Sequence, residues 1–396
     1  MRLRALPPVR RAVPMTRRRV AGGRPMDQFF GNRRIALYSS GTAALSRAIR
    51  DCAALSHKTA PEVIIPAYGC PDLVAACLHA SVFPRLVDVS PDVWGYSQPE
   101  LERCATKQTV AIVAVNLLGA GDGAAELSLF CRSREISLIQ DSAQHLPRTA
   151  TDWPGNYIVL SFGRGKPLNL LSGGALVSAE ARDSTMSAVP HRFPLKDRLL
   201  ASRFAAAGFN WLTRPWLYGL LSTLPGTGLG SVVYKVLDNE SPLPDRARSR
   251  VGAAFEQYLR GSSYRRDLWA PVLGDWQRWG IEELRSNSPD PEEEPLRLAL
   301  LAPDLESRDD LVAALVHEGL GASRFYGTEL SRITGIPESV QRQGPFPNAR
   351  RLAARLFTLP THTLVTTDVV RATHEIVRQW HHRRRTTLTN VSPRST

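Results

Sequence analysis

Lys166 closes a glycine-bearing turn, Ser161–Lys166, that directly follows the apolar run Tyr157–Leu160. The amine of a lysine at the end of a strand can form a Schiff base with a carbonyl compound if burial or a nearby cation, here Arg164, lowers its pKa. A solvated side chain is the commoner fate of a lysine in a loop. The turn therefore indicates either a covalent attachment point or an ordinary surface residue.

Asp141 follows a second apolar run and begins the segment Asp141–His145. Its carboxylate could pair with the protonated nitrogen of a pyridine ring, which turns that ring into an electron sink, or it could cap the next turn. The small residues Ser39–Thr42 open a helical segment, where unpaired backbone N–H groups suit an anion such as phosphate. Serine and threonine are also ordinary helix caps, so each of these features alone leaves two interpretations.

Between about residues 35 and 180, short β-branched apolar runs alternate with segments that show helical spacing. This alternation predicts a mainly parallel sheet with helices on both faces. Ligands bind at the carboxyl ends of the strands in such sheets, and Asp141 and Lys166 fall at or just after two of those ends. The expected strands are Val63–Ile65, Arg85–Val89, Val110–Val115, Ile136–Gln140, Tyr157–Ser161 and Ala175–Ser178, and the expected helices are Ala43–Leu55, Asp72–His79 and Ala124–Arg134.

From about residue 250 the pattern changes to helices with isolated strands, which predicts a smaller α+β domain. Its expected segments are Val251–Leu259, Pro295–Leu301, Arg308–His317, Ala349–Leu356, Leu356–Pro360 and Asp368–Trp380, and Ser288–Pro295 is expected to be an exposed loop. We therefore divide the chain into a basic, disordered tail (1–26), a large α/β domain (27–245), a smaller domain (246–380) and a second basic, disordered tail (381–396).

Residues 204–236 form an apolar insertion in the large domain, and Pro215–Tyr234 contain no charged residue. A membrane-spanning helix needs a run of about this length, but Pro225 and the glycines around it interrupt the run. We expect a buried dimer contact here, with contact to a membrane surface as the less favoured alternative.

The net charge of +13 lies almost entirely in the two ends of the chain, because residues 1–26 hold eight arginines and residues 381–396 hold four, with no acid in either segment. The near-neutral body argues against a basic face that binds nucleic acid. Disordered, solvated ends are the expected state of such segments. The five cysteines lack Cys-x-x-Cys spacing, which argues against disulfides and a zinc site and fits a reducing cytoplasm.

The segment Gly119–Ala124, with Asp141 further along the chain, matches the dinucleotide-binding pattern Gly-x-Gly-x-x-Gly/Ala. In that case Asp141 would bind a ribose hydroxyl. The pattern normally opens a domain, whereas here it lies deep within the α/β region. An oxidoreductase that uses a nicotinamide cofactor therefore remains an alternative.

Taken in order, these segments resemble the DegT/StrS-type sugar aminotransferases, a fold-type-I family whose members depend on pyridoxal 5'-phosphate. The similarity runs from about Ile35 to Gln379. It rests on Ser40–Leu45, Val63–Tyr68, Asp141–His145, Ser161–Phe162 with Lys166, Gly173–Ala175, Gly321–Tyr326 and Leu359–His362. The resemblance implies the fold-type-I architecture and a homodimer with shared active sites.

The resemblance also implies a set of site residues. Lys166 would hold the cofactor as a Schiff base and act as the catalytic base and acid, Asp141 would bind the pyridine nitrogen, and Ser161 the phosphate. Gln144 would lie near the ring hydroxyl. The other cofactor-binding candidates are Ser40, Gly41, Thr42, Tyr68 and Cys70, and the substrate-binding candidates are Asn116, Arg324 and Tyr326.

The reaction implied by the resemblance moves an amino group from an amino acid, glutamate in most relatives, to a keto sugar. Nucleotide-linked sugars used in cell-surface polysaccharides or glycoconjugates are the expected acceptors. Two departures bear on the substrate: Cys70 stands where many members carry an aromatic residue that stacks on the ring, a role that Tyr68 could take, and Ser172 stands where an acid often precedes the paired glycines.

Other functions on this fold stay open. One is a different fold-type-I reaction, such as dehydration or carbon–carbon chemistry, although dehydrating relatives tend to carry histidine in place of the lysine. The other is a non-catalytic assembly protein that uses the apolar insertion and the basic ends as contacts.

Overall fold

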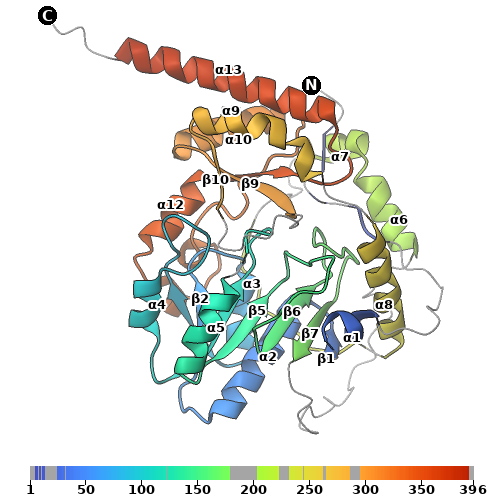
Figure 1. Ribbon diagram of the computed structural model, residues 1–396, viewed down its shortest axis with the longest axis vertical. Helices are drawn as coiled ribbons and strands as arrows, with labels where there is room; N and C mark the ends of the chain where they lie inside the picture. Colours follow the sequence, from blue (N-terminus) through green and yellow to red (C-terminus); the bar gives the residue numbers. More distant parts are fainter. Residues whose placement is uncertain are drawn as a thin grey trace, which may run out of the picture.

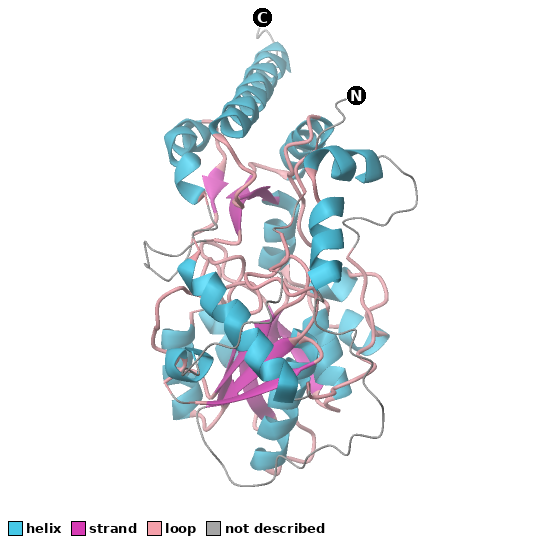
Figure 2. Cartoon of the chain, turned by 90° about the vertical axis from the view of Figure 1, so that its right-hand side faces the viewer, coloured by secondary structure: helices cyan, strands magenta, loops and turns pink. Residues whose placement is uncertain are grey.

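The computed structural model describes residues 5–7, 9, 11–13, 25–31, 33–121, 123–178, 203–222, 232–243, 245–261, 265–285 and 295–391. Within these ranges the chain forms a large domain around a seven-stranded sheet and a smaller domain around a three-stranded sheet. In Figures 1 and 2 the smaller domain lies above the large one.

The large sheet is mainly parallel, as the alternation of strands and helices predicts (Figure 1). Neighbouring strands from β6 to β3 pair in parallel, whereas β7 runs antiparallel to both β1 and β6. All residues of β4 are buried, as expected for a central strand covered on both faces. The order of strands is β1 (Arg34–Tyr38), β7 (Gly174–Ser178), β6 (Tyr157–Ser161), β5 (Ser137–Asp141), β4 (Thr109–Val115), β2 (Glu62–Pro66) and β3 (Phe83–Val87).

Helices cover both faces of this sheet because side chains alternate between the faces along each strand. On β4, Val113 belongs to the cluster with α2 (Gly41–Ser56) and α3 (Asp72–His79), whereas Ile112 packs with α4 (Gln98–Cys104) and α5 (Ala124–Ser133). On β6, Ile158 faces α1 (Pro25–Phe29) and α8 (Asp245–Arg260). The carboxyl ends of the strands therefore form the edge of the sheet at which side chains can contact a ligand.

The smaller domain has the antiparallel strands β10, β9 and β8, and its core centres on the fully buried Trp269 and Trp276. We expected the large domain to end at residue 245. Helix α8, which begins at this residue, packs with α1 and is therefore part of the large domain. The elements of the smaller domain are η1 (Arg266–Leu268), α9 (Ala270–Arg278), β8 (Glu282–Glu283), β9 (Arg297–Leu301), α10 (Leu305–His317), η2 (Leu330–Arg332), α11 (Glu338–Gln341), α12 (Pro347–Arg355), β10 (Leu356–Pro360) and α13 (Thr367–Val391). Of the loop expected at Ser288–Pro295, all but Pro295 lies outside the described residues.

The carboxyl-terminal end of the chain is helical well beyond the expected end of the smaller domain. Helix α13 lies across α9 and α10 at the top of Figure 1 and continues to residue 391. An ion pair of 2.6 Å between Arg384 and Asp304 ties its distal part to the start of α10. The expectation of a disordered tail is therefore wrong for residues 381–391, and residues 392–396 lie outside the described residues.

The amino-terminal segment is also bound to the rest of the protein. The backbone N–H of Leu6 donates to Gly319 and that of Val13 donates to Asn169, both at 2.8 Å. The side chains of Leu6 and Ala12 are buried. Disorder was thus the wrong expectation for residues 5–7 and 11–13, whereas residues 14–24 are outside the described part of the chain.

Helices α6 (Arg203–Leu212) and α7 (Pro215–Ser222) form most of the described part of the apolar insertion, on the right of Figure 1. They pack on the amino-terminal segment, where Ala206 is buried against Ala12. Among the helices that the structure describes, none is long and apolar enough to cross a membrane.

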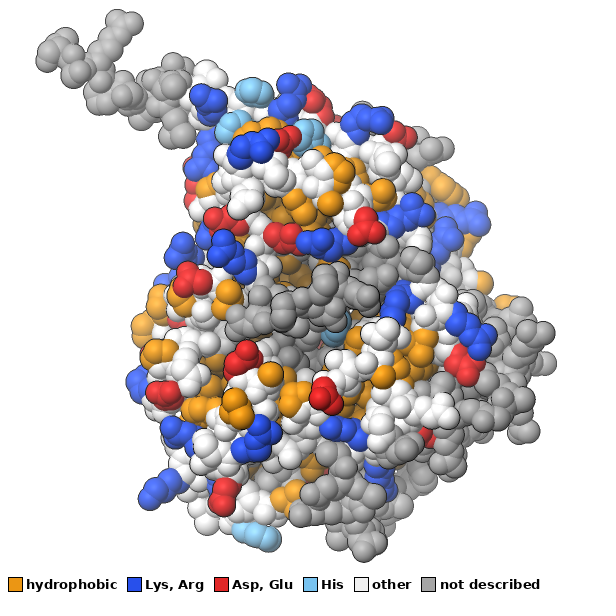
Figure 3. Space-filling view, in the orientation of Figure 1, with side chains coloured by type: hydrophobic (Ala, Val, Ile, Leu, Met, Phe, Trp, Pro, Cys, Tyr) orange, Lys and Arg blue, Asp and Glu red, His pale blue; other side chains and the backbone are white. Residues whose placement is uncertain are grey.

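Acidic and basic side chains are interspersed on the face shown in Figure 3. Ion pairs join acidic and basic side chains of the protein, such as Arg85 with Glu62, and Arg266 with Glu283 at 2.8 Å. This face keeps the near-neutral character expected of the body of the protein.

Candidate active site

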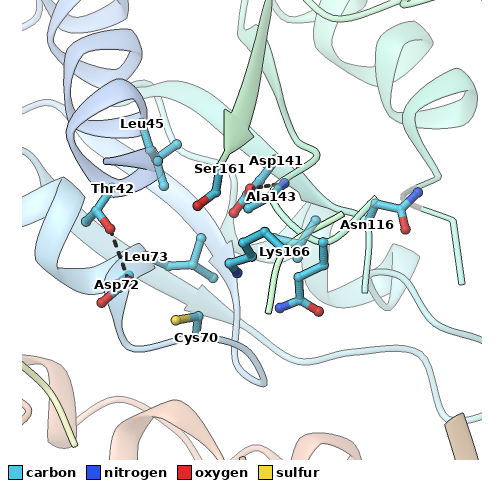
Figure 4. Close-up of a pocket in the computed structure, with 13 residues that line it drawn as sticks. Thr42, Leu45, Cys70, Asp72, Leu73, Asn116, Asp141, Ala143, Ser161 and Lys166 are labelled. Carbon is cyan, nitrogen blue, oxygen red and sulfur yellow. Dashed lines mark hydrogen bonds between the residues drawn. The ribbon is translucent and has the colours of Figure 1, made fainter. Parts of the chain in front are cut away.

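A pocket at the carboxyl edge of the large sheet brings together most of the residues singled out from the sequence (Figure 4). They come from the first turn of α2, from the start of α3 and from the ends of β4, β5 and β6. The lining residues are Gly41, Thr42, Leu45, Cys70, Asp72, Leu73, Val115, Asn116, Asp141, Ala143, Gln144, Ser161 and Lys166.

The start of α2 lies directly against the end of β6. Ser40 caps the helix through its side-chain oxygen, which accepts a hydrogen bond of 3.0 Å from the Ala43 N–H. Gly41 is required by a close approach, since a Cβ atom at this position would lie 2.7 Å from the Cβ of Ser161. The first turn of α2 and the Ser161 hydroxyl therefore face one pocket, an arrangement that suits an anion such as phosphate.

Lys166 is held by a tight turn whose two ends are fixed. Gly165 has a φ of +74°, a left-handed conformation that favours glycine. The Lys166 N–H donates to the Gly163 carbonyl at 3.3 Å, and the N–H of the fully buried Phe162 donates to Gly173 at 2.8 Å. The Lys166 side chain extends from this turn into the pocket (Figure 4).

Asp141 ends β5 and turns its carboxylate into the same pocket. Burial raises the pKa of this carboxyl, while a hydrogen bond from the Ala143 N–H and the nearby Lys166 amine act in the opposite direction. The Ala143 N–H reaches only Oδ1, at 3.0 Å. A half-buried carboxylate of this kind can accept a hydrogen bond from a protonated ring nitrogen.

Cys70 lies in the pocket wall. Burial raises the pKa of its thiol to about 12, so the thiol stays protonated at neutral pH. Tyr68 does not line the pocket. It is fully buried, and its ring packs edge-on against those of Tyr326, at 5.6 Å, and Trp94, at 6.4 Å.

Gln144 connects the pocket to two other parts of the chain. Its side-chain oxygen accepts a hydrogen bond of 3.2 Å from the Leu118 N–H, and its nitrogen donates one of 2.6 Å to the Tyr326 hydroxyl. In the loop that contains Leu118, the Asn116 side chain accepts a hydrogen bond of 3.0 Å from the Gly119 N–H. The glycine-rich segment that matches the dinucleotide pattern thus follows the pocket residue Asn116, but none of its described residues lines the pocket.

Four of the sequence-predicted residues do not line the pocket. Ser40 uses its side chain as a helix cap, and Tyr68 lies behind the pocket wall. Arg324 is half-exposed and forms an ion pair of 2.8 Å with Asp309, so it does not reach the pocket. Tyr326 lies beside the pocket and touches it through Gln144.

Asp72 is a pocket residue that the sequence analysis missed. Its carboxylate accepts a hydrogen bond of 3.0 Å from the Thr42 hydroxyl, at the end of the pocket where α2 begins (Figure 4). Its position just after the carboxyl end of β2 was the available signal, because site residues are expected there. We had interpreted Asp72 only as the first residue of a helix.

The model of the DegT/DnrJ/EryC1/StrS aminotransferase family matches residues 24–205. A putative L-glutamine:3-amino-2,3-dideoxy-scyllo-inosose aminotransferase of Micromonospora echinospora is 31% identical over 154 residues, which are 36% of this chain and 34% of the relative. GDP-perosamine synthase of Escherichia coli O157:H7 is 27% identical over 147 residues, 35% of this chain and 39% of the relative. The chain thus spans little more than a third of the length of these relatives.

Solved structures extend the likeness to both domains. The structure of NtdA from Bacillus subtilis with the bound cofactor PMP superposes with a TM-score of 0.63 at 17% identity, covering 92% of this chain and 78% of that one. At this identity the comparison supports the fold alone. The expected fold-type-I architecture is confirmed.

Proposed function

We propose that the chain, whose residues 24–205 match the model of the DegT/DnrJ/EryC1/StrS aminotransferase family, is a pyridoxal-phosphate-dependent aminotransferase that transfers an amino group from an amino acid to a keto sugar. One observation carries the proposal: Lys166, Asp141, Ser161 and the first turn of α2 line a single pocket. A lysine amine, a buried carboxylate and an anion site are the groups that this chemistry needs.

The residues present fit pyridoxal phosphate at three points. The first turn of α2 and Ser161 suit the phosphate, and Gly41 lets the two lie against each other, since a Cβ there would meet Ser161. Asp141 and Lys166 line the same pocket, where the carboxylate would bind the pyridine nitrogen and the amine would bind the aldehyde. Asp72 fits less well, because its carboxylate lies beside the proposed phosphate site.

Pyridoxal phosphate supplies an aldehyde that binds amines and a ring that delocalises the electron pair left by a broken C–H bond. With the cofactor bound, Lys166 would hold its aldehyde through the side-chain amine. Once an amino donor had taken that place, the Lys166 amine would act as the base that takes a proton from the α-carbon of the donor and as the acid that returns it. Asp141 would favour the protonated state of the ring nitrogen, and Gln144 would hydrogen-bond the ring hydroxyl.

The names of the relatives support a sugar-like ketone as acceptor. One is named for an L-glutamine donor and an inosose acceptor, and another for the synthesis of GDP-perosamine, a nucleotide-linked amino sugar. We propose a donor from the glutamate–glutamine pair and a nucleotide-linked keto sugar as acceptor, in the synthesis of cell-surface polysaccharides or glycoconjugates. A cytoplasmic homodimer with shared active sites is part of the same proposal.

The test compares Lys166→Ala with Lys107→Ala, which removes an exposed lysine outside the pocket. Each protein is mixed with pyridoxal phosphate, reduced with borohydride and digested, and the peptide that carries the cofactor is identified by mass spectrometry. We expect a yellow protein and a modified Lys166 in the wild type and in Lys107→Ala. Lys166→Ala should show neither the colour nor transfer of the amino group from glutamate or glutamine.

Two results would overturn the proposal. The first is a protein that stays colourless and gains no cofactor-modified peptide. The second is a protein that binds pyridoxal phosphate at Lys166 but does not convert it to the pyridoxamine form with any amino donor, which would favour a non-catalytic protein on this fold.

A further inference from the structure

The outer side of α6 and α7 is apolar where a soluble protein normally carries polar residues. Phe204 is 89% exposed, Trp211 50% and Trp216 46%, and Leu212 and Leu220 are also exposed. The smaller residues between them on the outer side of α6 include Ala205, Ala207 and Gly208, all exposed. We call these eight residues the α6–α7 face. Contiguous exposed apolar residues of this kind mark a surface that binds a partner.

The inner sides of the two helices are anchored, so the apolar side chains do not reflect a loosely placed segment. The Asn210 side chain exchanges two hydrogen bonds with the Ala12 backbone, at 2.7 and 3.0 Å. The Ala5 N–H donates to the Pro215 carbonyl at 2.8 Å, and Leu217 is buried. Both helices therefore have a packed side and an opposite, solvent-exposed side.

The charges around the α6–α7 face indicate what kind of partner it binds. Residues 203–222 contain Arg203 and Arg214 but no aspartate or glutamate. Arg214 and Arg11 line a shallow hollow of about 470 Å³ next to the Trp211 ring. A second copy of this chain, docked by two-fold symmetry, would bring these arginines together without acids from the same segment to pair with them. An anionic surface would match them.

The aromatic residues agree with a lipid surface as that partner. Tryptophan is enriched where a membrane meets water, because its ring is apolar and its N–H is polar. Trp211 and Trp216 lie close together, with ring centroids 6.2 Å apart. Short helices with an apolar side and flanking arginines lie in the plane of the interface and do not cross the bilayer. Helices α6 and α7 are too short to span it.

We propose that the α6–α7 face binds the surface of a membrane that contains anionic phospholipids. The apolar side chains of the face enter the interfacial layer, and Arg11 and Arg214 contact headgroup phosphates. Attachment in this way is peripheral and reversible. It is independent of the proposed transamination, since no residue of the α6–α7 face lines the pocket around Lys166.

The experiment measures co-flotation of the full chain with vesicles of phosphatidylcholine alone or of phosphatidylcholine mixed with phosphatidylglycerol. The wild type should bind the mixed vesicles with a blue shift in tryptophan fluorescence and bind the neutral vesicles weakly. The double variant Trp211→Ser/Trp216→Ser should bind the mixed vesicles at least tenfold more weakly. Arg214→Gln should weaken this binding about fivefold, the share expected of one arginine near an anionic surface.

The matched controls are Leu129→Ser on α5 and Val316→Ser on α10, which remove exposed apolar residues elsewhere and should leave binding unchanged. Thermal melting shows whether each variant is folded. Absence of wild-type binding to both vesicle types overturns the proposal, and so does equal binding by the double variant. Sedimentation equilibrium can also overturn the proposal. If the wild type is a dimer that does not bind vesicles, and the double variant is a monomer, the face binds a second copy of the chain. Bound cofactor at Lys166 is read separately by its colour, so the two proposals fail independently.

Discussion

The side chain of Gln144 donates a hydrogen bond of 2.6 Å to the hydroxyl of Tyr326, a residue of the smaller domain. Gln144 follows the end of β5 in the large domain and also lines the pocket. This contact ties the position of a pocket residue to the packing of the two domains.

Replacement of Tyr326 by phenylalanine should lower both stability and cofactor affinity. The variant loses the hydroxyl that satisfies the Gln144 amide, a change of about 1 kcal/mol in the free energy of unfolding. Gln144 is then less well held in the pocket, so pyridoxal phosphate should dissociate more readily. Chemical denaturation measures the first effect, and titration with the cofactor measures the second.

Tyr96→Phe is the matched control for this variant. The Tyr96 hydroxyl donates a hydrogen bond of 2.6 Å to the Val113 carbonyl outside the pocket. It should cost a similar free energy of unfolding but leave cofactor affinity unchanged. Equal cofactor affinities in Tyr326→Phe and the wild type would contradict the role assigned to the Gln144 contact.

Asp72→Asn should tighten the binding of pyridoxal phosphate. The Asp72 carboxylate accepts the hydroxyl of Thr42 at the end of the pocket proposed for the phosphate. Two like charges about 4 Å apart in water repel by roughly 1 kcal/mol, so the dissociation constant should fall about fivefold. Pyridoxal, which has no phosphate, should bind equally well to both proteins. The exposed Asp92, changed to asparagine, serves as the control. If Asp72→Asn also bound pyridoxal more tightly than the wild type does, the effect would not depend on the phosphate.

Asp141→Asn should stabilise the cofactor-free protein while weakening its binding of the cofactor. Burial raises the pKa of Asp141 above its ordinary value of 3.8 in the folded state. The folded state therefore favours the protonated carboxyl. The stability that this proton contributes is fully present below pH 3.8 and is lost as the pH rises through the raised pKa. Asparagine carries no charge, so the variant avoids this loss and should be the more stable protein at neutral pH.

Thermal melts of the cofactor-free proteins across this pH range provide the check. The advantage of Asp141→Asn should be small at the acidic end and should grow toward neutral pH. Asp88→Asn should instead lower the melting temperature, because the buried Asp88 carboxylate accepts hydrogen bonds from the backbone of Val89, Asn348 and Ala349. A neutral-pH melting temperature of Asp141→Asn below that of the wild type would contradict the prediction.

Local patterns predicted the sheet and the pocket well. β6 and α3 have the bounds expected from the sequence, since strand alternation and helical spacing are local properties. The carboxyl ends of parallel strands meet at one edge, which is why Asp141 and Lys166 could be expected to lie near each other. The direction of a side chain is not local: Arg324 turned toward Asp309 on α10, and Asp72 turned into the pocket.

The end segments show the same limit. The distal part of α13 is rich in arginine and histidine, a composition typical of disorder. It is helical because Trp279 of the smaller domain stacks on His381 at 5.2 Å and Arg384 pairs with Asp304. Such partners lie far away in the sequence, so composition alone could not reveal them.

The amino-terminal segment allows a direct test of this conclusion through Leu6→Ala. The Leu6 side chain is buried against the smaller domain, near Gly321, and its backbone N–H donates to Gly319. Loss of a buried leucine side chain should lower the free energy of unfolding by about 2 kcal/mol. Leu129→Ala, at a position that is 64% exposed on α5, should cost less than about 0.5 kcal/mol. Denaturant unfolding of the two variants is the test, because in a disordered tail Leu6→Ala would change the free energy of unfolding as little as Leu129→Ala does.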